Sequence, residues 1–188
     1  GGPSVKPYQP SGLWVAGSHW PRLFDQQRYV ADQAENLVRR SVYTFVKRTS
    51  PHPTMTTFDA TNREVCSMRR SRTNTPLQAL VLLNDPQFVE ASRALAERAL
   101  TRFSSTKERL SFLVRCVLAR NPSRVELAIL TRGLTSKLSH YQAHPAEASL
   151  LLRVGSLPRN QKLDAAQHAA WTVIASTVMN LHEAITRE

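Results

Sequence analysis

Cysteine is scarce in this sequence, and its scarcity excludes several kinds of protein. The 188 residues contain only Cys66 and Cys116, which are too few for a disulfide scaffold and lack the spacing of a zinc site. We predict that these two cysteines do not form a disulfide. Cys66 lies in an expected loop, whereas Cys116 lies on the apolar face of an expected helix, and a disulfide requires two closely placed Cα atoms.

Long apolar runs are also missing. The longest apolar stretches lie around residues 77–83 and 169–174, whereas a helix that crosses a membrane needs about 18 consecutive apolar residues. We therefore expect no membrane span.

The histidines do not show the spacing of a metal site. His140 and His144 are four residues apart, but the end of a helix is expected between them. The other four histidines have no histidine partner at that spacing and no acidic companion at ligand spacing. We therefore expect no metal site in this chain.

Acidic residues are outnumbered by basic ones. The sequence has 25 Lys and Arg against 14 Asp and Glu, which gives a formal charge of +11, and 20 of the basic residues are arginine. Such a charge favours polyanions, and arginine forms bidentate contacts with carboxylate, sulfate or phosphate groups. The sequence has no motif that interleaves basic and aromatic residues, so we do not expect nucleic acid as the partner.

Prolines and capping residues divide the second half of the chain into helices. Thr75 before Pro76 is typical of a helix start, and Ser123 with Glu126 has the spacing of a capping box. The expected helices cover residues 76–83, 86–103, 106–120, 124–141, 145–154 and 165–179, the last capped by Asp164. The last is apolar around much of its circumference, so we expect it at the centre of the core.

The first half of the chain is less regular. We predict a proline-rich extended arm over residues 1–24, a helix over 25–48, a long ordered basic loop over 49–75 and a helical core over 76–188. Trp14 and Trp20 of the arm are expected to pack against the body. The predicted fold is mainly α: one domain formed as an irregular multi-helix bundle.

The basic loop contains the strongest candidate site. Arg63, Arg69, Arg70 and Arg72 lie within ten residues and lead into the helix start at Thr75. Unpaired amides at a helix start and guanidinium groups together suit a sulfate, phosphate or carboxylate. The candidate anion site consists of Arg63, Arg69, Arg70, Arg72, Asn74, Thr75 and Gln78. The alternative is structural, in which these arginines pair internally with the carboxylates of Asp59, Glu64 and Asp85.

Several blocks of the sequence resemble one family. These blocks are residues 1–10, 39–48, 58–60, 62–66, 72–86, 170–172, 180–181 and 186–188. They are similar to the planctomycete-type secreted domain of unknown function found at the C-terminus of planctomycete cytochrome-c-domain proteins. The resemblance implies an exported protein of the periplasm or cell envelope. It also implies that this chain is the C-terminal part of a larger protein, with haem-bearing domains upstream, and it implies no known reaction.

Two functional hypotheses follow. The first is a non-catalytic helical module that docks the upstream domains of its parent, or an acidic partner such as a sulfated polysaccharide, through the basic loop. The second is a polysaccharide-active or redox-associated enzyme domain with its site around Arg63–Gln78. The sequence has no C-x-x-C-H motif, so we expect no covalently bound haem. We expect no other cofactor in this chain either.

Overall fold

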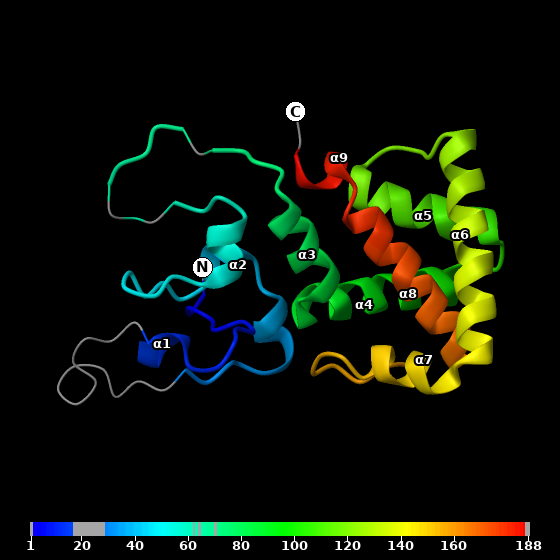
Figure 1. The fold of residues 1–188 in the computed structure, drawn as a ribbon, viewed down its shortest axis with the longest axis horizontal. Coiled ribbons are helices and arrows are strands. Elements are labelled where there is room, and N and C mark those ends of the chain that lie inside the picture. Colours follow the sequence, from blue (N-terminus) through cyan, green and yellow to red (C-terminus); the bar gives the residue numbers. More distant parts are fainter. Residues whose placement is uncertain (1, 17–28, 62, 64, 70, 187–188) are drawn as a thin grey trace. The chain divides into compact units, whose positions relative to one another are not determined.

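A computed structural model describes residues 2–16, 29–61, 63, 65–69 and 71–186 of the chain (Figure 1). The sequence predicted one domain, whereas the structure divides the chain into two compact units, Gly1–Gln78 and Ala79–Glu188. Helix α3 (Pro76–Asn84) begins in the first unit and continues into the second. Within the described part, no helix has the length and apolar character needed to cross a membrane.

The described part of the first unit consists mainly of irregular segments. Its regular elements are short: α1 (Leu13–Ala16), the 3-10 helices η1 (Ala34–Val38) and η2 (Ser41–Tyr43), and α2 (Pro53–Thr57). A parallel bridge joins Val5 to Thr44. In this bridge the Val5 amide donates to the Tyr43 carbonyl at 2.8 Å, and the Phe45 amide donates to the Val5 carbonyl at 2.8 Å. The arm is therefore fixed to the segment around Thr44 by backbone hydrogen bonds.

The helix predicted over residues 25–48 is wrong for the part that the structure describes. Ala34 adopts a positive φ of 53°, which interrupts a right-handed helix, and Arg39 is extended. Further along, the amides of Tyr43 and Thr44 still bond back to Arg40 and Ser41, in a single 3-10 turn, whereas the Tyr43 carbonyl and the Phe45 amide bond to Val5. The contact with the arm thus takes over where the short turn ends, and no α-helix continues through residues 43–45.

Trp14 anchors the small core of the first unit. Its side chain is buried, and its ring meets those of Tyr29 and Phe45 at centroid distances of 5.0 and 5.7 Å. The ammonium groups of Lys6 and Lys47 lie 5.5 and 4.9 Å from the Trp14 ring, so cation–π contacts add to the packing. The predicted packing of Trp14 is confirmed, and Trp20 lies outside the described residues.

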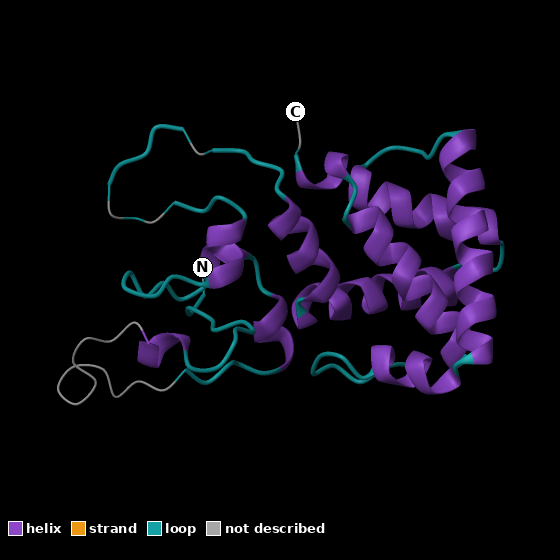
Figure 2. Cartoon of the chain, in the orientation of Figure 1, coloured by secondary structure: helices purple, strands orange, loops and turns teal. Residues whose placement is uncertain are grey.

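The second unit is helical, and the mainly α prediction is confirmed (Figure 2). Its helices after α3 are α4 (Pro86–Arg102), α5 (Thr106–Leu118), α6 (Arg124–Ala143), α7 (Pro145–Leu152), α8 (Ala165–Met179) and α9 (His182–Ile185). All six predicted helices begin at the expected residue. Helix α9 was not expected.

The helix starts follow the expected caps. The Asp85 carboxylate accepts a hydrogen bond from the Gln87 amide at 2.9 Å, and the Asp164 carboxylate accepts one from the Gln167 amide at 2.8 Å. Ser123 and Glu126 form the predicted capping box at the start of α6. These hydrogen bonds satisfy amides that have no partner inside the helix, which is why such residues favour helix starts.

Helix α8 lies at the centre of the second unit and packs against α4, α6 and α7 (Figure 1). The buried core consists of Ala96, Ala99, Leu100, Leu110, Leu113, Leu134, Ala170, Trp171, Ile174 and Ala175. The alanines of α4 and α8 allow the two helices to approach closely, and Trp171 fills the space between them and their neighbours. The predicted central position of α8 is therefore confirmed.

The ends of three helices meet at Arg120. Its guanidinium group donates to the Glu126 carboxylate of α6 at 2.7 and 3.0 Å and to the Glu183 carboxylate of α9 at 2.8 and 2.6 Å. Arg120 lies two residues after the end of α5, so one side chain connects the end of α5 with the starts of α6 and α9. These bonds lower the pKa of Glu126 to about 2, mainly through the hydrogen bond with Arg120.

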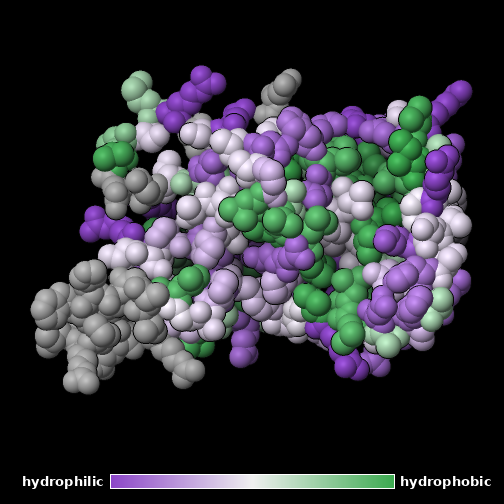
Figure 3. Space-filling view, viewed as in Figure 1, coloured by the Kyte–Doolittle hydropathy of each residue, from purple (hydrophilic) through white to green (hydrophobic). Residues whose placement is uncertain are grey.

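Helix α3 keeps apolar side chains at the surface. Leu77, Leu80 and Leu83 are all exposed, and they recur every three residues along one stripe of the helix. Hydrophobic side chains gather at the surface in the region of this helix (Figure 3).

Candidate functional site

The ends of the basic loop are held by a cluster of polar side chains. Asp59 accepts hydrogen bonds from the Thr73 amide at 2.8 Å and from the Thr73 hydroxyl at 2.7 Å. The Gln78 side chain, which is only 1% exposed, donates from Nε2 to the Thr57 carbonyl at 2.9 Å and to the Thr73 hydroxyl at 3.0 Å. Residues 57–59 are therefore joined to residues 73–78, which closes the loop at its base.

Thr75 and Gln78 also form a reciprocal cap at the start of α3. The Thr75 amide donates to Gln78 Oε1 at 3.0 Å, and the Gln78 amide donates to the Thr75 hydroxyl at 3.3 Å. This is a capping box, and the Thr-x-x-Gln spacing of the sequence is the signal that could have found it. The side-chain oxygen of Gln78 is used in this cap, and its nitrogen is used in the bonds to Thr57 and Thr73. Gln78 therefore has a structural role here.

The arginines of the loop lie at the surface. Arg63, Arg69 and Arg72 are exposed, as is Asn74, whereas Arg70 lies outside the described residues. Arg63 and Arg69 form no ion pair with any residue that the structure describes. The loop also exposes Val65 and Met68, whose exposed fractions are 72% and 106%. The anion site at this loop remains a prediction.

Both cysteines are free and exposed. The expectation that Cys116 lies on the apolar face of its helix is wrong, because α5 buries Leu110, Leu113 and Val114 instead. At 3.6 residues per turn, Cys116 lies roughly 110° around the helix axis from the centre of that stripe, and it is exposed.

A buried charged pair on α4 forms a second polar cluster, which the sequence did not indicate. Glu90 and Arg93 are 3% and 4% exposed, and their charged groups lie 3.9 Å apart. The Glu90 carboxylate accepts hydrogen bonds from the amides of Ser156 at 2.5 Å and Leu157 at 3.2 Å. The Arg93 guanidinium donates to the carbonyls of Leu152 at 2.6 Å and Leu157 at 2.5 Å. The pair therefore fixes the connection between α7 and α8 onto α4.

The same α4 segment contacts a buried histidine of α8. His168 is fully buried, and its Nε2 donates to the Arg93 carbonyl at 3.2 Å. Burial lowers the pKa of the His168 imidazole, because removing water disfavours the charged form. His168 is thus a neutral packing residue that joins α8 to α4.

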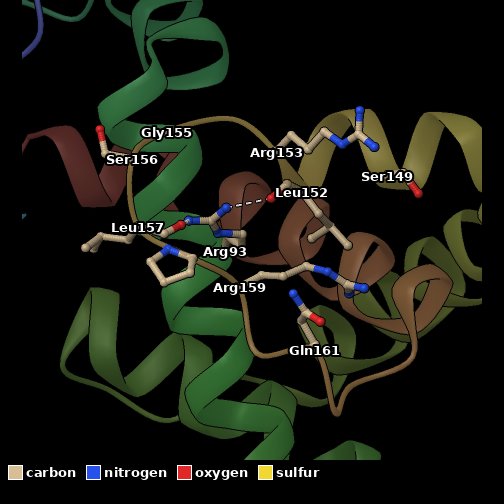
Figure 4. A pocket seen from close by; sticks show the side chains of 10 residues that line it. Arg93, Ser149, Leu152, Arg153, Gly155, Ser156, Leu157, Arg159 and Gln161 are labelled. Carbon is tan, nitrogen blue, oxygen red and sulfur yellow. Dashed lines mark hydrogen bonds between the residues drawn. The ribbon is translucent and has the colours of Figure 1, made fainter.

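An open pocket of about 420 Å³ lies over this cluster (Figure 4). Its lining residues are Arg93, Ser149, Leu152, Arg153, Gly155, Ser156, Leu157, Pro158, Arg159 and Gln161. The charged residues of the lining are all arginines. The guanidinium of Arg93 is directed into the connecting segment, where a dashed line marks its bond to Leu152. A pocket of this chemistry suits a small anion. Sequence reasoning missed it because Arg93 lies about sixty positions before Arg153 and Arg159.

One group of histidine and carboxylate side chains among the described residues places three possible metal ligands close together. Ligand atoms of His140, His144 and Glu147 all lie within 4.8 Å of one another. The sequence placed a helix end between the two histidines, and α6 does end at Ala143. The sharp corner that follows keeps the two imidazoles together, and their rings stack at a centroid distance of 4.7 Å.

The fold and these sites define a mainly α module with basic surfaces and no recognisable catalytic constellation among the described residues. The chain belongs to the PSD1 family, described as a protein of unknown function (DUF1553), whose model matches residues 1–134. No curated protein and no solved structure matches the chain significantly. The family match covers the basic loop, whereas most of the arginine pocket and the His140 group lie beyond it.

Proposed function

We propose that this chain is a non-catalytic helical module that docks an acidic protein surface through residues 61–72 of its basic loop. The observation that carries this proposal is the composition of the exposed surface in that loop. Arg63 and Arg69 form no ion pair with any described residue, and Val65 and Met68 lie exposed between them.

This mixture of side chains favours a protein partner over a polysaccharide. Arginine and methionine are enriched at protein interfaces, where arginine forms bidentate contacts with carboxylates and methionine adapts to irregular apolar surfaces. A sulfated or acidic polysaccharide would use the arginines but would leave Val65 and Met68 in water.

The closed base of the loop supports the same function. Asp59 and Gln78 bond to Thr73 and Thr57, so the two ends of the loop are already fixed next to each other. Fixing the ends before binding lowers the conformational entropy lost on docking. The enzyme alternative, with its site around Arg63–Gln78, receives less support because the Gln78 amide is buried and fully bonded.

The partner that we propose is the upstream part of the same parent protein. The resemblance to the planctomycete-type secreted domain motivates this choice, as it does an exported, cell-envelope location and a parent that contains cytochrome-c-type domains. In that setting the module would hold neighbouring domains together, and it would carry no haem itself.

Binding to two probes tests the proposal. A glutamate-rich peptide that contains leucine represents an acidic protein surface, and heparin represents a sulfated polysaccharide. One variant replaces Arg63, Arg69, Arg70 and Arg72 with Gln. A control of equal charge replaces four exposed helix arginines with Gln, namely Arg102, Arg115, Arg124 and Arg132.

We expect the loop variant to bind the peptide at least tenfold more weakly than the control variant, with a shallower dependence on salt because fewer charged contacts form. Equal weakening in both variants would mean that net charge alone drives binding. Retention on heparin with no peptide binding would assign the loop to a polysaccharide instead.

A further inference from the structure

We propose that His140, His144 and Glu147 form a binding site for a divalent transition-metal ion of the zinc type at the corner between α6 and α7. The three residues supply two imidazole nitrogens and one carboxylate oxygen, and these atoms lie within 4.8 Å of one another. This donor set suits zinc, nickel or copper, whereas calcium and magnesium prefer ligand sets made of oxygen alone.

The backbone creates this arrangement through an abrupt corner. Helix α6 ends at Ala143 and α7 begins at Pro145, so His144 is the only residue between them. Proline disfavours the helical conformation in the residue before it, and His144 leaves the helix with φ −126° and ψ 66°. In a continuous helix, residues 140 and 147 would be about 10 Å apart along the axis. The corner instead brings His140 Nε2 and Glu147 Oε2 to 2.8 Å.

His144 is already oriented as a metal ligand. Its Nδ1 lies 2.9 Å from the His140 carbonyl oxygen, and because a carbonyl only accepts, Nδ1 must donate. In the neutral imidazole this leaves the lone pair on Nε2 available for a metal. Histidine ligands in proteins commonly donate their other ring nitrogen to a backbone carbonyl or carboxylate, which fixes the ring and raises its basicity.

The second imidazole is held beside the first. The His140 and His144 rings stack with an interplanar angle of 26°, and the His140 Nε2 makes the contact with Glu147. A metal ion would take the place of the proton shared by that nitrogen and oxygen. Around a tetrahedral ion with bonds of about 2.1 Å, neighbouring ligand atoms lie about 3.4 Å apart. The His140–Glu147 contact must therefore widen by roughly half an ångström, and a ligand pair at the 4.8 Å limit must close by about 1.4 Å. All three side chains are exposed, so they have room to rotate.

Three protein ligands leave at least one coordination position open. The side chains of His140 and Glu147 are 43% and 54% exposed, so this position faces solvent. Zinc sites with three protein ligands and a water molecule differ in this way from closed structural sites with four protein ligands. The bound ion would also connect the end of α6 to the first turn of α7.

Isothermal titration of the metal-free 188-residue chain with zinc chloride tests this inference. We expect one zinc ion per chain, with no binding of calcium or magnesium at the same concentrations. His140→Ala, His144→Ala and the isosteric Glu147→Gln should each weaken zinc binding at least tenfold. His182→Ala, which removes another exposed histidine, should leave the affinity unchanged.

Two further measurements separate this site from other zinc ligands. The Cys66→Ser/Cys116→Ser chain should keep full affinity, since both exposed thiols could otherwise bind zinc. Zinc should also raise the thermal midpoint of the native chain but not that of Glu147→Gln, because a ligand selective for the folded state stabilises it by mass action. The proposal would be overturned if zinc binding were lost with the cysteines, or if it persisted at native strength in Glu147→Gln and His144→Ala. It would also be overturned if the native chain bound no zinc.

Discussion

Position 155 requires glycine for two separate reasons. Gly155 has a φ of +96°, which side chains other than glycine rarely adopt, and a Cβ atom there would lie 1.7 Å from the Glu90 carboxylate oxygen. We expect Gly155→Ala to lower the free energy of unfolding by about 3 kcal/mol, since it combines backbone strain with displacement of a buried, hydrogen-bonded carboxylate. Urea denaturation measures this change.

Gly12 supplies a matched control for that substitution. It also has a positive φ, of +84°, but nothing lies within 4 Å of a Cβ added there. Gly12→Ala should therefore show the backbone strain alone, about 1 kcal/mol. Equal effects at the two positions would contradict the role assigned to the Glu90 contact.

The buried pair of α4 shows which residues local sequence patterns cannot assign. The sequence indicates a helix around Glu90 and Arg93, but charged residues in a helix are expected at the surface. Their partners are backbone groups of residues 152–157, roughly sixty positions later. Burial of the pair depends on this distant segment, so no local pattern predicts it. Arg63 and Arg69 of the basic loop differ from this pair. They are exposed, as a local pattern of charged residues already predicts.

The cap at the start of α3 gives a prediction for a single element. Thr75 and Gln78 exchange two hydrogen bonds there. Thr75→Ala removes the hydroxyl acceptor and should lower the free energy of unfolding by about 1 kcal/mol. Ser105→Ala is the control, because Ser105 precedes α5 without a side-chain cap bond and should be nearly neutral. Denaturant midpoints of the two variants give the comparison, and equal midpoints would show that the cap contributes nothing.

The Arg120 cluster makes the start of α6 sensitive to acid. The hydrogen bond with Arg120 is the main cause that lowers the pKa of Glu126 from its ordinary 4.5 to about 2. The carboxylate therefore stabilises the folded state fully above about pH 4.5, and this contribution is lost as the pH falls towards 2. Because the group is partly exposed, we expect Glu126→Gln to cost about 1 kcal/mol at pH 7.

Urea midpoints measured from pH 7 down to pH 2.5 test this dependence. The difference between the native chain and Glu126→Gln should shrink steadily below pH 4.5. A difference that stays constant over this range would mean that the carboxylate charge does not matter and that only the shape of the cap does.

The elements themselves could be predicted where their signals are local. Asp85, Ser123 and Asp164 each cap the helix that follows within three residues, so the starts of α4, α6 and α8 follow from the sequence. The segment 25–48 has apolar residues at mixed three- and four-residue steps but no comparable cap. Its described part pairs with Val5 instead, and a contact with a residue nearly forty positions away leaves no periodic signal.

At the scale of the whole chain, the basic loop should be the first place that trypsin cleaves within the described part. Arg63, Arg69 and Arg72 are exposed and lie outside regular helices, whereas Lys107 and Arg132 lie within helices of the second unit. Proteases cut exposed irregular segments in preference to helices. Brief digestion followed by mass spectrometry should give a persistent fragment that starts at Thr73. Early cleavage after Lys107 or Arg132 would show that the second unit is not the stable part.

The second unit requires residues on both sides of the point where the family match ends. That match stops at residue 134, inside α6, whereas α8 lies beyond it and packs against α4 and α6. Trp171 and Ile174 of α8 are buried in the core with Ala99 of α4. A chain that ends at residue 134 loses these two large side chains, and removing even one buried large residue costs about 3 kcal/mol or more. We expect this truncated chain to lose its cooperative thermal transition, measured by circular dichroism at 222 nm.

A chain that ends at Leu181 keeps α8 and should retain the transition, with a lower midpoint because the Glu183 contact of Arg120 is gone. A cooperative transition in the shorter chain would mean that residues 79–134 form a core without α8.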